Sequence, residues 1–478
     1  MKKIISKLLI FAVSATFIVG CDALEPVNPN LSEDAILGQP NSANLWLNGI
    51  ERQLAIMLNR NLVISELASD NYVNTKTYFN QYMDNLDINY QDNDINRSQW
   101  MIARLREMAV YGLEKVGPND PIVTDAITAE FHFFKGLAHL YSAMYYKTLP
   151  AEPAGPVLTR AQHLSTAISS FDQALNLDPA HVASMVGKAR CYWLQGDADA
   201  AITACDAAIA ADGNFLRVAL FDDVNSGAQN GLNYTSSDIQ LALWGRGTFD
   251  DLQPKPFLDF LDPKFSLVQA GVEAPVSILK IEEAYLIKAE AQQSKANDGG
   301  AIQTLTDLFT VVSGREVRNI NDGAEDRDQN VPGQRPDSTD VIVDGRAGLV
   351  LYRKGGNVDV PSVSGTSYTA ADLAGLSGDA LLDMIYRIRQ EVFIAEGMRS
   401  VDMGITLVLS ENEYLLNSNA SASDIEADIP TYLMAVKDQI DDITYDPAGT
   451  VPRSCTSDVD ITALIVANKT SNYVCPFH

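Results

Sequence analysis

Cysteine and histidine are scarce in this sequence, and neither occurs in a pattern that binds a metal. The 478 residues include five Cys and five His. No two cysteines have the CxxC spacing, so a zinc ribbon or a thioredoxin-like site is not indicated. His132 and His139 lie seven residues apart on one predicted helix, but no third ligand accompanies them, and we expect both to pack. We therefore expect neither a metal nor a cofactor.

Local catalytic motifs are also missing. The sequence has no HExxH, no GxSxG and no P-loop. A glycosidase needs only two suitably spaced carboxylates, and the 62 acidic residues leave a surface glycosidase open as an alternative. The interpretation that we favour is a protein that is not an enzyme.

Positive charge and long apolar runs are in short supply as well. Lys and Arg number 35 against 62 Asp and Glu, which gives a formal net charge of −27. An acidic surface repels phosphate backbones, so this balance argues against nucleic-acid binding. After residue 20 no apolar run approaches the roughly 20 residues that a membrane-spanning helix requires.

The first 20 residues predict a lipoprotein signal peptide. Three lysines, at positions 2, 3 and 7, precede an apolar run over residues 8–19, which is too short to remain as a membrane anchor. The run ends in Gly20-Cys21, which resembles the bacterial lipobox. We expect cleavage before Cys21 and lipid on its sulfur and amino group, because several acyl chains together anchor a protein firmly. An ordinary secretory signal is the alternative.

The remaining cysteines fall into two pairs. Cys191 and Cys205 lie in a predicted helical pair, and we expect them to be small buried residues rather than a disulfide. Cys455 and Cys475 lie near the C-terminus. In an oxidising compartment these two form a disulfide or remain as thiols, and the sequence leaves both outcomes open.

An internal repeat is the strongest structural signal. Six positions recur after 34 residues, the period of tetratricopeptide repeats: Ala167, Ile168, Phe171, Ala174, Leu175 and Asp178 return as Ala201, Ile202, Cys205, Ala208, Ile209 and Asp212. Gly196-Asp197 forms the turn between helices expected over 182–195 and 198–211. We expect TPR-like helices over 121–213 and 278–314 and a further helix over 377–397. The predicted class is mostly α, a scaffold of helical hairpins with long irregular loop excursions.

Two segments resemble the SusD/RagB family of outer-membrane nutrient-binding lipoproteins. Residues 278–291 end in Lys-Ala-Glu-Ala, and residues 388–403 contain Glu391-Val-Phe-Ile-Ala-Glu396-Gly-Met-Arg399-Ser-Val-Asp402, close to the family signature. We interpret these charged residues as structural locks between helices rather than as a catalytic cluster. Residues 21–478 are expected to form one SusD-like domain. Its segment 410–478 departs from the family pattern, and the tail from about residue 445 is expected to be irregular.

The resemblance implies a function. SusD-like proteins are not enzymes; they bind a glycan or another nutrient at the cell surface and act with a SusC-like TonB-dependent β-barrel transporter that imports it. This chain is accordingly expected to be outer-membrane, lipid-anchored and exposed at the surface. A periplasmic TPR lipoprotein that binds protein partners is the alternative.

The family's ligand residues vary and lie in no shared motif, so the candidates come from the aromatic and polar loops of this chain. Aromatic faces suit sugar rings because these carry C–H-rich faces beside polar edges. Amide side chains can hydrogen-bond hydroxyl groups. The candidate ligand-binding residues are Asn71, Tyr72, Asn74, Tyr78, Phe79, Tyr82 and Trp244.

Overall fold

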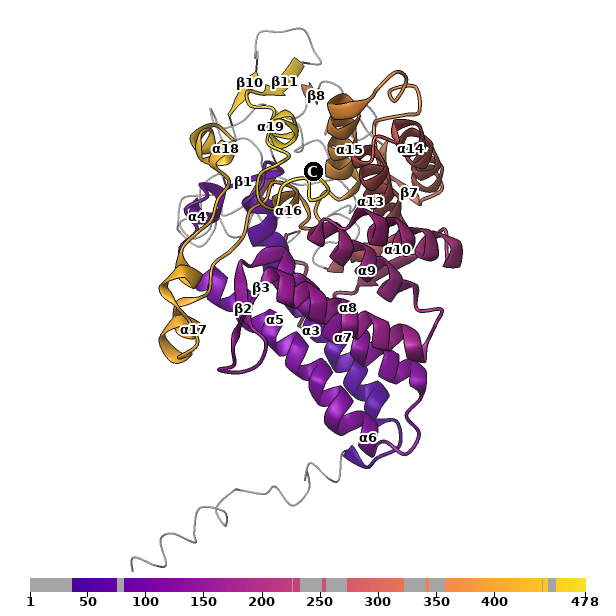
Figure 1. Ribbon diagram of the computed structural model, residues 1–478, viewed down its shortest axis with the longest axis vertical. Helices are drawn as coiled ribbons and strands as arrows, with labels where there is room; N and C mark the ends of the chain where they lie inside the picture. Colours follow the sequence, from indigo (N-terminus) through magenta and orange to yellow (C-terminus); the bar gives the residue numbers. More distant parts are fainter. Residues whose placement is uncertain are drawn as a thin grey trace, which may run out of the picture.

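The computed structural model describes residues 37–74, 81–225, 227–232, 252–254, 273–321, 341–343, 357–440, 442–445 and 453–478. Figure 1 shows long helices grouped at one end of the molecule and shorter helices and strands at the other. The predicted class, mostly α with TPR-like hairpins, is confirmed. Among the described residues no helix combines the length and apolar character that a membrane crossing demands.

Four helices form the elongated part of the molecule: α3 (Ser42–Leu67), α5 (Asn93–Tyr111), α7 (Asp125–Tyr145) and α8 (Arg160–Leu177). The starts of α5, α7 and α8 are defined by side-chain caps, which satisfy otherwise unpaired backbone N–H groups. The Asp92 carboxylate accepts from the N–H of Asp94, and Thr159 forms a capping box with Gln162. Ile95, Ile102 and Ala109 repeat at helical spacing on the buried face of α5.

The TPR hairpin has the boundaries that the sequence predicts. Helix α9 spans Val182–Gln195 and α10 spans Ala198–Ala211. Gly196 ends α9 in the left-handed conformation (φ 76°), and Asp197 caps α10 by accepting from the N–H of Ala200. Cys191 and Cys205 are buried free thiols, as expected.

The second hairpin is confirmed with one correction. Helices α13 (Ile281–Ser294) and α14 (Asp298–Ser313) pack against each other, and α13 also packs against α10. The predicted helix start at residue 278 is wrong, because Val276–Lys280 forms strand β6. All five residues of β6 are buried, and the strand pairs antiparallel with β4 (Leu216–Ala219). A run of β-branched and apolar residues buried on both sides favours a strand.

Short strand pairs join the segments that lie between the helices. Strands β2 (Thr148–Pro150) and β3 (Val157–Thr159) form a hairpin before α8. Elsewhere β1 (Tyr72–Asn74) pairs with β5 (Leu252–Pro254), and β7 (Val317–Asn321) pairs with β9 (Asn357–Pro361). A three-stranded sheet contains β10 (Ile443–Tyr445), β11 (Arg453–Ser457) and β8 (Val341–Val343) in that order.

Buried ion pairs join the helices at the two segments that resemble the SusD family. Glu283 accepts from Arg190 at 2.6 Å, and Glu282 accepts from Arg315 at 2.7 Å. From helix α15 (Gly378–Val392) Arg389 binds Asp402 at 2.7 Å. A buried charge without its partner is costly, so each pair holds its two elements in one register.

The same arrangement accounts for the signature residues that follow α15. Arg399, at the start of the short helix α16 (Arg399–Asp402), binds Asp70 just beyond α3 at 2.6 Å. Glu396 binds Lys280 at 2.7 Å, and Glu391 accepts from the hydroxyl groups of Thr366 and Ser367. These contacts join α15 and α16 to other parts of the protein, as the structural interpretation of the signature predicts.

The C-terminal part is more ordered than the sequence predicts. It contains α17 (Glu411–Leu416), α18 (Thr431–Met434) and α19 (Ile461–Ala467), together with β10 and β11. The expectation of an irregular tail after residue 445 is therefore wrong. Helix α19 forms because Asp460 caps it and because Ile461 and Ile465, one turn apart, are buried in its contact with α15.

Cys475, one of the two cysteines whose pairing the sequence leaves open, is a buried free thiol in this structure, and the side chain of Cys455 lies outside the described part. Burial, with Glu290 nearby, raises the pKa of this thiol. A buried, protonated thiol packs as a small apolar side chain and is poorly reactive.

Candidate functional site

The predicted ligand residues do not gather into one described site. Asn71 is fully buried; its amide donates to Glu66 at 2.8 Å and accepts from Gln390 at 2.9 Å. Tyr72 is buried in strand β1. The side chains of Asn71 and Tyr72 are therefore packed inside the protein in this structure, and neither presents a face to a ligand.

The other candidates lie at or beyond the edge of the described chain. Tyr82, on the short helix α4 (Gln81–Asp84), is exposed. The backbone of Asn74 forms part of β1, and Tyr78, Phe79 and Trp244 lie outside the described residues. The pairing of β1 with β5 does bring the loop after α3 beside residues 252–254.

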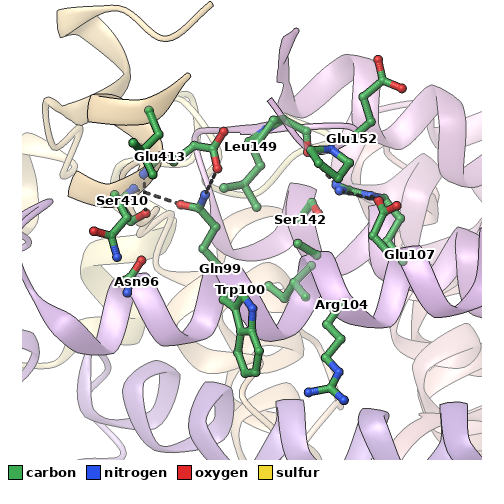
Figure 2. A pocket seen from close by; sticks show the side chains of 17 residues that line it. Asn96, Gln99, Trp100, Arg104, Glu107, Ser142, Leu149, Glu152, Ser410 and Glu413 are labelled. Carbon is green, nitrogen blue, oxygen red and sulfur yellow. Dashed lines mark hydrogen bonds and ion pairs between the residues drawn. The ribbon is translucent and has the colours of Figure 1, made fainter. Parts of the chain in front are cut away.

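A cavity of about 500 Å³ lies elsewhere, between α5, the β2–β3 hairpin and α17. Figure 2 shows that its wall combines residues far apart in the sequence: Asn96 to Glu107 on α5, Leu149 and Glu152 from the hairpin, and Ser410 and Glu413 around α17. Pockets of this size, with a few convergent polar groups, are typical of small-ligand sites. Because its wall joins α5, the β2–β3 hairpin and α17, together with Ser142 of α7, this pocket is the candidate functional site.

Trp100 gives the pocket an aromatic face. It lines the cavity yet is 55% exposed, which is unusual for the largest apolar side chain. Its neighbour Arg104, one helical turn further, places its guanidinium carbon 5.5 Å from the centre of the indole ring. This contact fixes one side of the tryptophan by a cation–π interaction. The exposed part of the indole is therefore a preorganised apolar surface.

Arg106 is a buried residue of the pocket wall. The guanidinium is buried and donates to the carbonyl of Pro150 at 2.6 Å and to Glu107 at 2.9 Å. Burial lowers the pKa of Arg106, while Glu107, Glu413 and Glu152 act in the opposite direction. Arg106 thus connects α5 to the β2–β3 hairpin.

Helix α17 is attached to the opposite wall by amide side chains. Gln99 accepts from the N–H of Ser410 at 2.9 Å and points its amide nitrogen to Glu413, 3.4 Å away, as Figure 2 shows. Asn417 donates to Glu413 at 2.8 Å and to the carbonyl of Gly155 at 2.9 Å. Glu413 is therefore oriented by two amides. Leu416 lines the pocket and is exposed, as is its neighbour Leu415.

Two hydrogen-bonded histidines, His139 and His163, connect α7 and α8 to the β2–β3 hairpin. His163 Nε2 lies 2.9 Å from the carbonyl oxygen of Leu149, and because a carbonyl only accepts, this nitrogen carries the proton. His163 Nδ1 then accepts from His139 Nδ1, also at 2.9 Å. Burial lowers the pKa of His139 to about 2 and that of His163 to about 4, so both rings are neutral. The expectation that His139 packs is confirmed.

Sequence reasoning missed this site because its members lie on a helix rather than in a loop. The signal was present: Asn96, Trp100, Ala103, Arg104 and Glu107 follow helical spacing on the face of α5 opposite its apolar residues. A tryptophan on a polar helical face is out of phase with the buried stripe. What could not be predicted is that residues 149–153 and 410–416 lie across from it.

Comparisons with known proteins agree with this architecture. A tetratricopeptide repeat family model matches residues 154–214. A search among curated proteins finds no match for this chain. Among solved structures, a SusD superfamily protein from Bacteroides thetaiotaomicron aligns with a TM-score of 0.52 at 12% identity, over 85% of this chain and 94% of that one.

Two further solved structures are similar. A SusD superfamily protein from Bacteroides fragilis has a TM-score of 0.51 at 16% identity and covers 81% of this chain and 100% of its own. A protein from Bacteroides vulgatus, named as a candidate sugar binding protein, has a TM-score of 0.50 at 12% identity, over 83% of this chain and 96% of that one. The chain therefore has the SusD-like fold, built around a tetratricopeptide repeat.

Proposed function

We propose that this protein is a lipid-anchored outer-membrane protein, exposed at the cell surface, that binds a glycan in the pocket between α5 and α17. The observation that carries the proposal is Trp100, an exposed indole lining a cavity of about 500 Å³. The proposal is supported by the SusD-like fold and by the name of the similar Bacteroides vulgatus structure.

The chemistry of the wall suits a sugar. A pyranose ring can lie with its C–H face on the indole, while its hydroxyl groups reach the polar side chains around it. Asn96, Asn412 and Glu413 supply amide and carboxylate groups at this wall. Because Gln99 and Asn417 already orient Glu413, little ordering cost falls on that side chain when a ligand binds.

We propose binding without catalysis. A glycosidase requires one carboxylic acid that holds its proton and a second carboxylate at a suitable distance. In this pocket Glu107 is paired with Arg106, and Glu413 accepts from two amides, so contacts within the protein already engage both carboxylates. Incubating the protein with glycans and analysing the mixture by chromatography tests this point, and release of shorter products would overturn it.

The decisive variant is Trp100→Ala. We expect it to weaken glycan binding about tenfold, because an aromatic platform contributes on the order of 1 kcal/mol or slightly more to a stacked contact. Trp100→Phe should retain most of the affinity, and Leu45→Ala, an equally exposed apolar change not among the pocket-lining residues, should leave it unchanged. Equal affinity of the wild type and Trp100→Ala in isothermal titration would refute the site.

We further propose delivery to a SusC-like TonB-dependent β-barrel transporter, with the lipid on Cys21 as the membrane anchor. The support is the family resemblance and the lipobox-like Gly20-Cys21. Pull-down of the tagged, lipidated protein from detergent-solubilised membranes, followed by mass spectrometry, should recover a large barrel. Recovery of periplasmic proteins without a barrel would instead favour the protein-binding scaffold. Protease shaving of whole cells tests surface exposure, since a periplasmic protein is protected.

A further inference from the structure

We infer that the pocket between α5 and α17 selects neutral or amino-substituted glycans and rejects glycans that carry carboxylate or sulfate groups. This inference rests on the proposed function and concerns the substrate class of the same site. It follows from the numbers of acidic and basic side chains around the cavity, and from the hydrogen bonds and ion pairs that these side chains already form within the protein.

Acidic groups outnumber basic groups at the pocket. Three carboxylates line it, from Glu107, Glu152 and Glu413, against two guanidinium groups, from Arg104 and Arg106. Glu411 lies on the same short helix as Glu413, where its carboxylate accepts from Gln91 at 3.0 Å and adds a further negative charge. The whole chain carries a formal net charge of −27. Both the local and the overall potential are therefore negative.

The two arginines do not reverse this balance for a ligand. Arg106 is buried, and its guanidinium already donates to Glu107 and to the carbonyl of Pro150. Recognition of a carboxylate by arginine normally uses two parallel N–H donors from one guanidinium. Arg104 is exposed and lies over the Trp100 ring, so a sugar acid reaching it would sit in water close to the three carboxylates.

An uncharged ring avoids this repulsion and still gains the indole contact. A protonated amino group gains in addition, because carboxylates accept strong charge-assisted hydrogen bonds. Two unit charges 4 Å apart in water interact by an amount that corresponds to about a fivefold change in affinity. We therefore expect each acidic glycan to bind about fivefold to tenfold more weakly than its neutral counterpart.

The test uses ligand pairs that share a backbone and differ in charge. Homogalacturonan hexamer is compared with its fully methyl-esterified form, and cellohexaose with the cellouronate hexamer and the chitosan hexamer. Affinities are measured by isothermal titration with the full mature chain at low and at moderate salt. We expect the neutral or amino-bearing member of each pair to bind more tightly. The difference in affinity should become smaller as salt is added, because salt screens charges near the surface.

Variants distinguish the effect of the carboxylates that line the pocket from the effect of the net charge of the whole chain. Glu152→Gln and Glu413→Gln should each reduce the discrimination against the acidic member. Glu114→Gln, which removes one exposed carboxylate not among those lining the pocket, should leave it unchanged. Acidic members that bind as tightly as their neutral counterparts in the wild type would overturn the inference while leaving the proposed function standing. No binding of any member, with Trp100→Ala indistinguishable from the wild type, would overturn both.

Discussion

Phe171 offers the sharpest test of how the TPR part of the chain is packed. Its ring is fully buried between α7 and α9 and lies against two glycines. A Cβ added at Gly136 would come within 2.7 Å of ring atom Cε1, and one added at Gly187 would come within 2.7 Å of Cζ. Carbon atoms are normally about 3.5 Å or more apart. Either Gly→Ala change therefore forces the ring or a helix to move.

The magnitude follows from two opposing terms. Overpacking a dense core costs about 1–3 kcal/mol, while replacing a helical glycine by alanine gains about 0.5–1 kcal/mol. We expect Gly136→Ala and Gly187→Ala each to lower the free energy of unfolding by about 1–2 kcal/mol. Combining either change with Phe171→Leu should cost less than the sum of the single variants by at least about 1 kcal/mol, since neighbours that share one space couple.

Urea unfolding followed by circular dichroism measures these differences from the shift of the midpoint at constant slope. Gly299→Ala is the matched control, because a Cβ there meets nothing within 4 Å and helix α14 gains a better helix former. If Gly136→Ala and Gly299→Ala change stability in the same direction, a Cβ at position 136 does not clash with the Phe171 ring.

Three further predictions concern the buried charges and the pocket. Burial raises the pKa of Glu290 to about 7 from 4.5; the folded chain then holds a proton that the unfolded chain has lost, so stability should fall by about 3 kcal/mol as pH rises from 4.5 to 7. Glu290→Gln should remove this dependence in urea titrations at several pH values, and an unchanged slope would contradict the burial of a protonated carboxyl group. Glu283→Ala leaves the buried Arg190 without its partner and should cost about 3–5 kcal/mol in the same assay, whereas Lys295→Ala, which breaks an exposed pair with Asp199, should change stability little. Trp100→Ala should weaken glycan binding about tenfold with no loss of thermal stability, because the indole is 55% exposed; a matching fall in melting temperature would indicate a structural role instead.

The helical hairpins were predictable because their signals are local. Gly196 and Asp197 each satisfy a backbone requirement of the turn, and the 34-residue period fixes the faces of α9 and α10. Residues 278–280 were mistaken for helix because a short apolar run has no distinctive period, and only the pairing with β4 decides its conformation. Likewise, Ile461 and Ile465 are buried because α19 packs against α15, which is far away in the sequence.

The site was less predictable than the fold. Asn71 and Tyr72 satisfied the composition expected of a ligand-binding loop, but Asn71 completes a buried network with Glu66 and Gln390, and Tyr72 is buried in β1. Trp100 was visible as an aromatic residue out of phase on α5, yet its partners at Glu152 and Glu413 come from elements about 50 and 310 residues further along the chain. Sequence patterns report local periodicity and contain little information on which distant surfaces meet.

The most direct test of the account is a structure of the mature protein with the neutral oligosaccharide that binds most tightly. We expect a sugar ring stacked on the exposed face of Trp100, with its hydroxyl groups at Asn96, Asn412 or Glu413. A sugar bound instead by Tyr82 and residues 75–80, with the α5–α17 pocket empty, would contradict the assignment of the site and favour the aromatic residues predicted from the sequence.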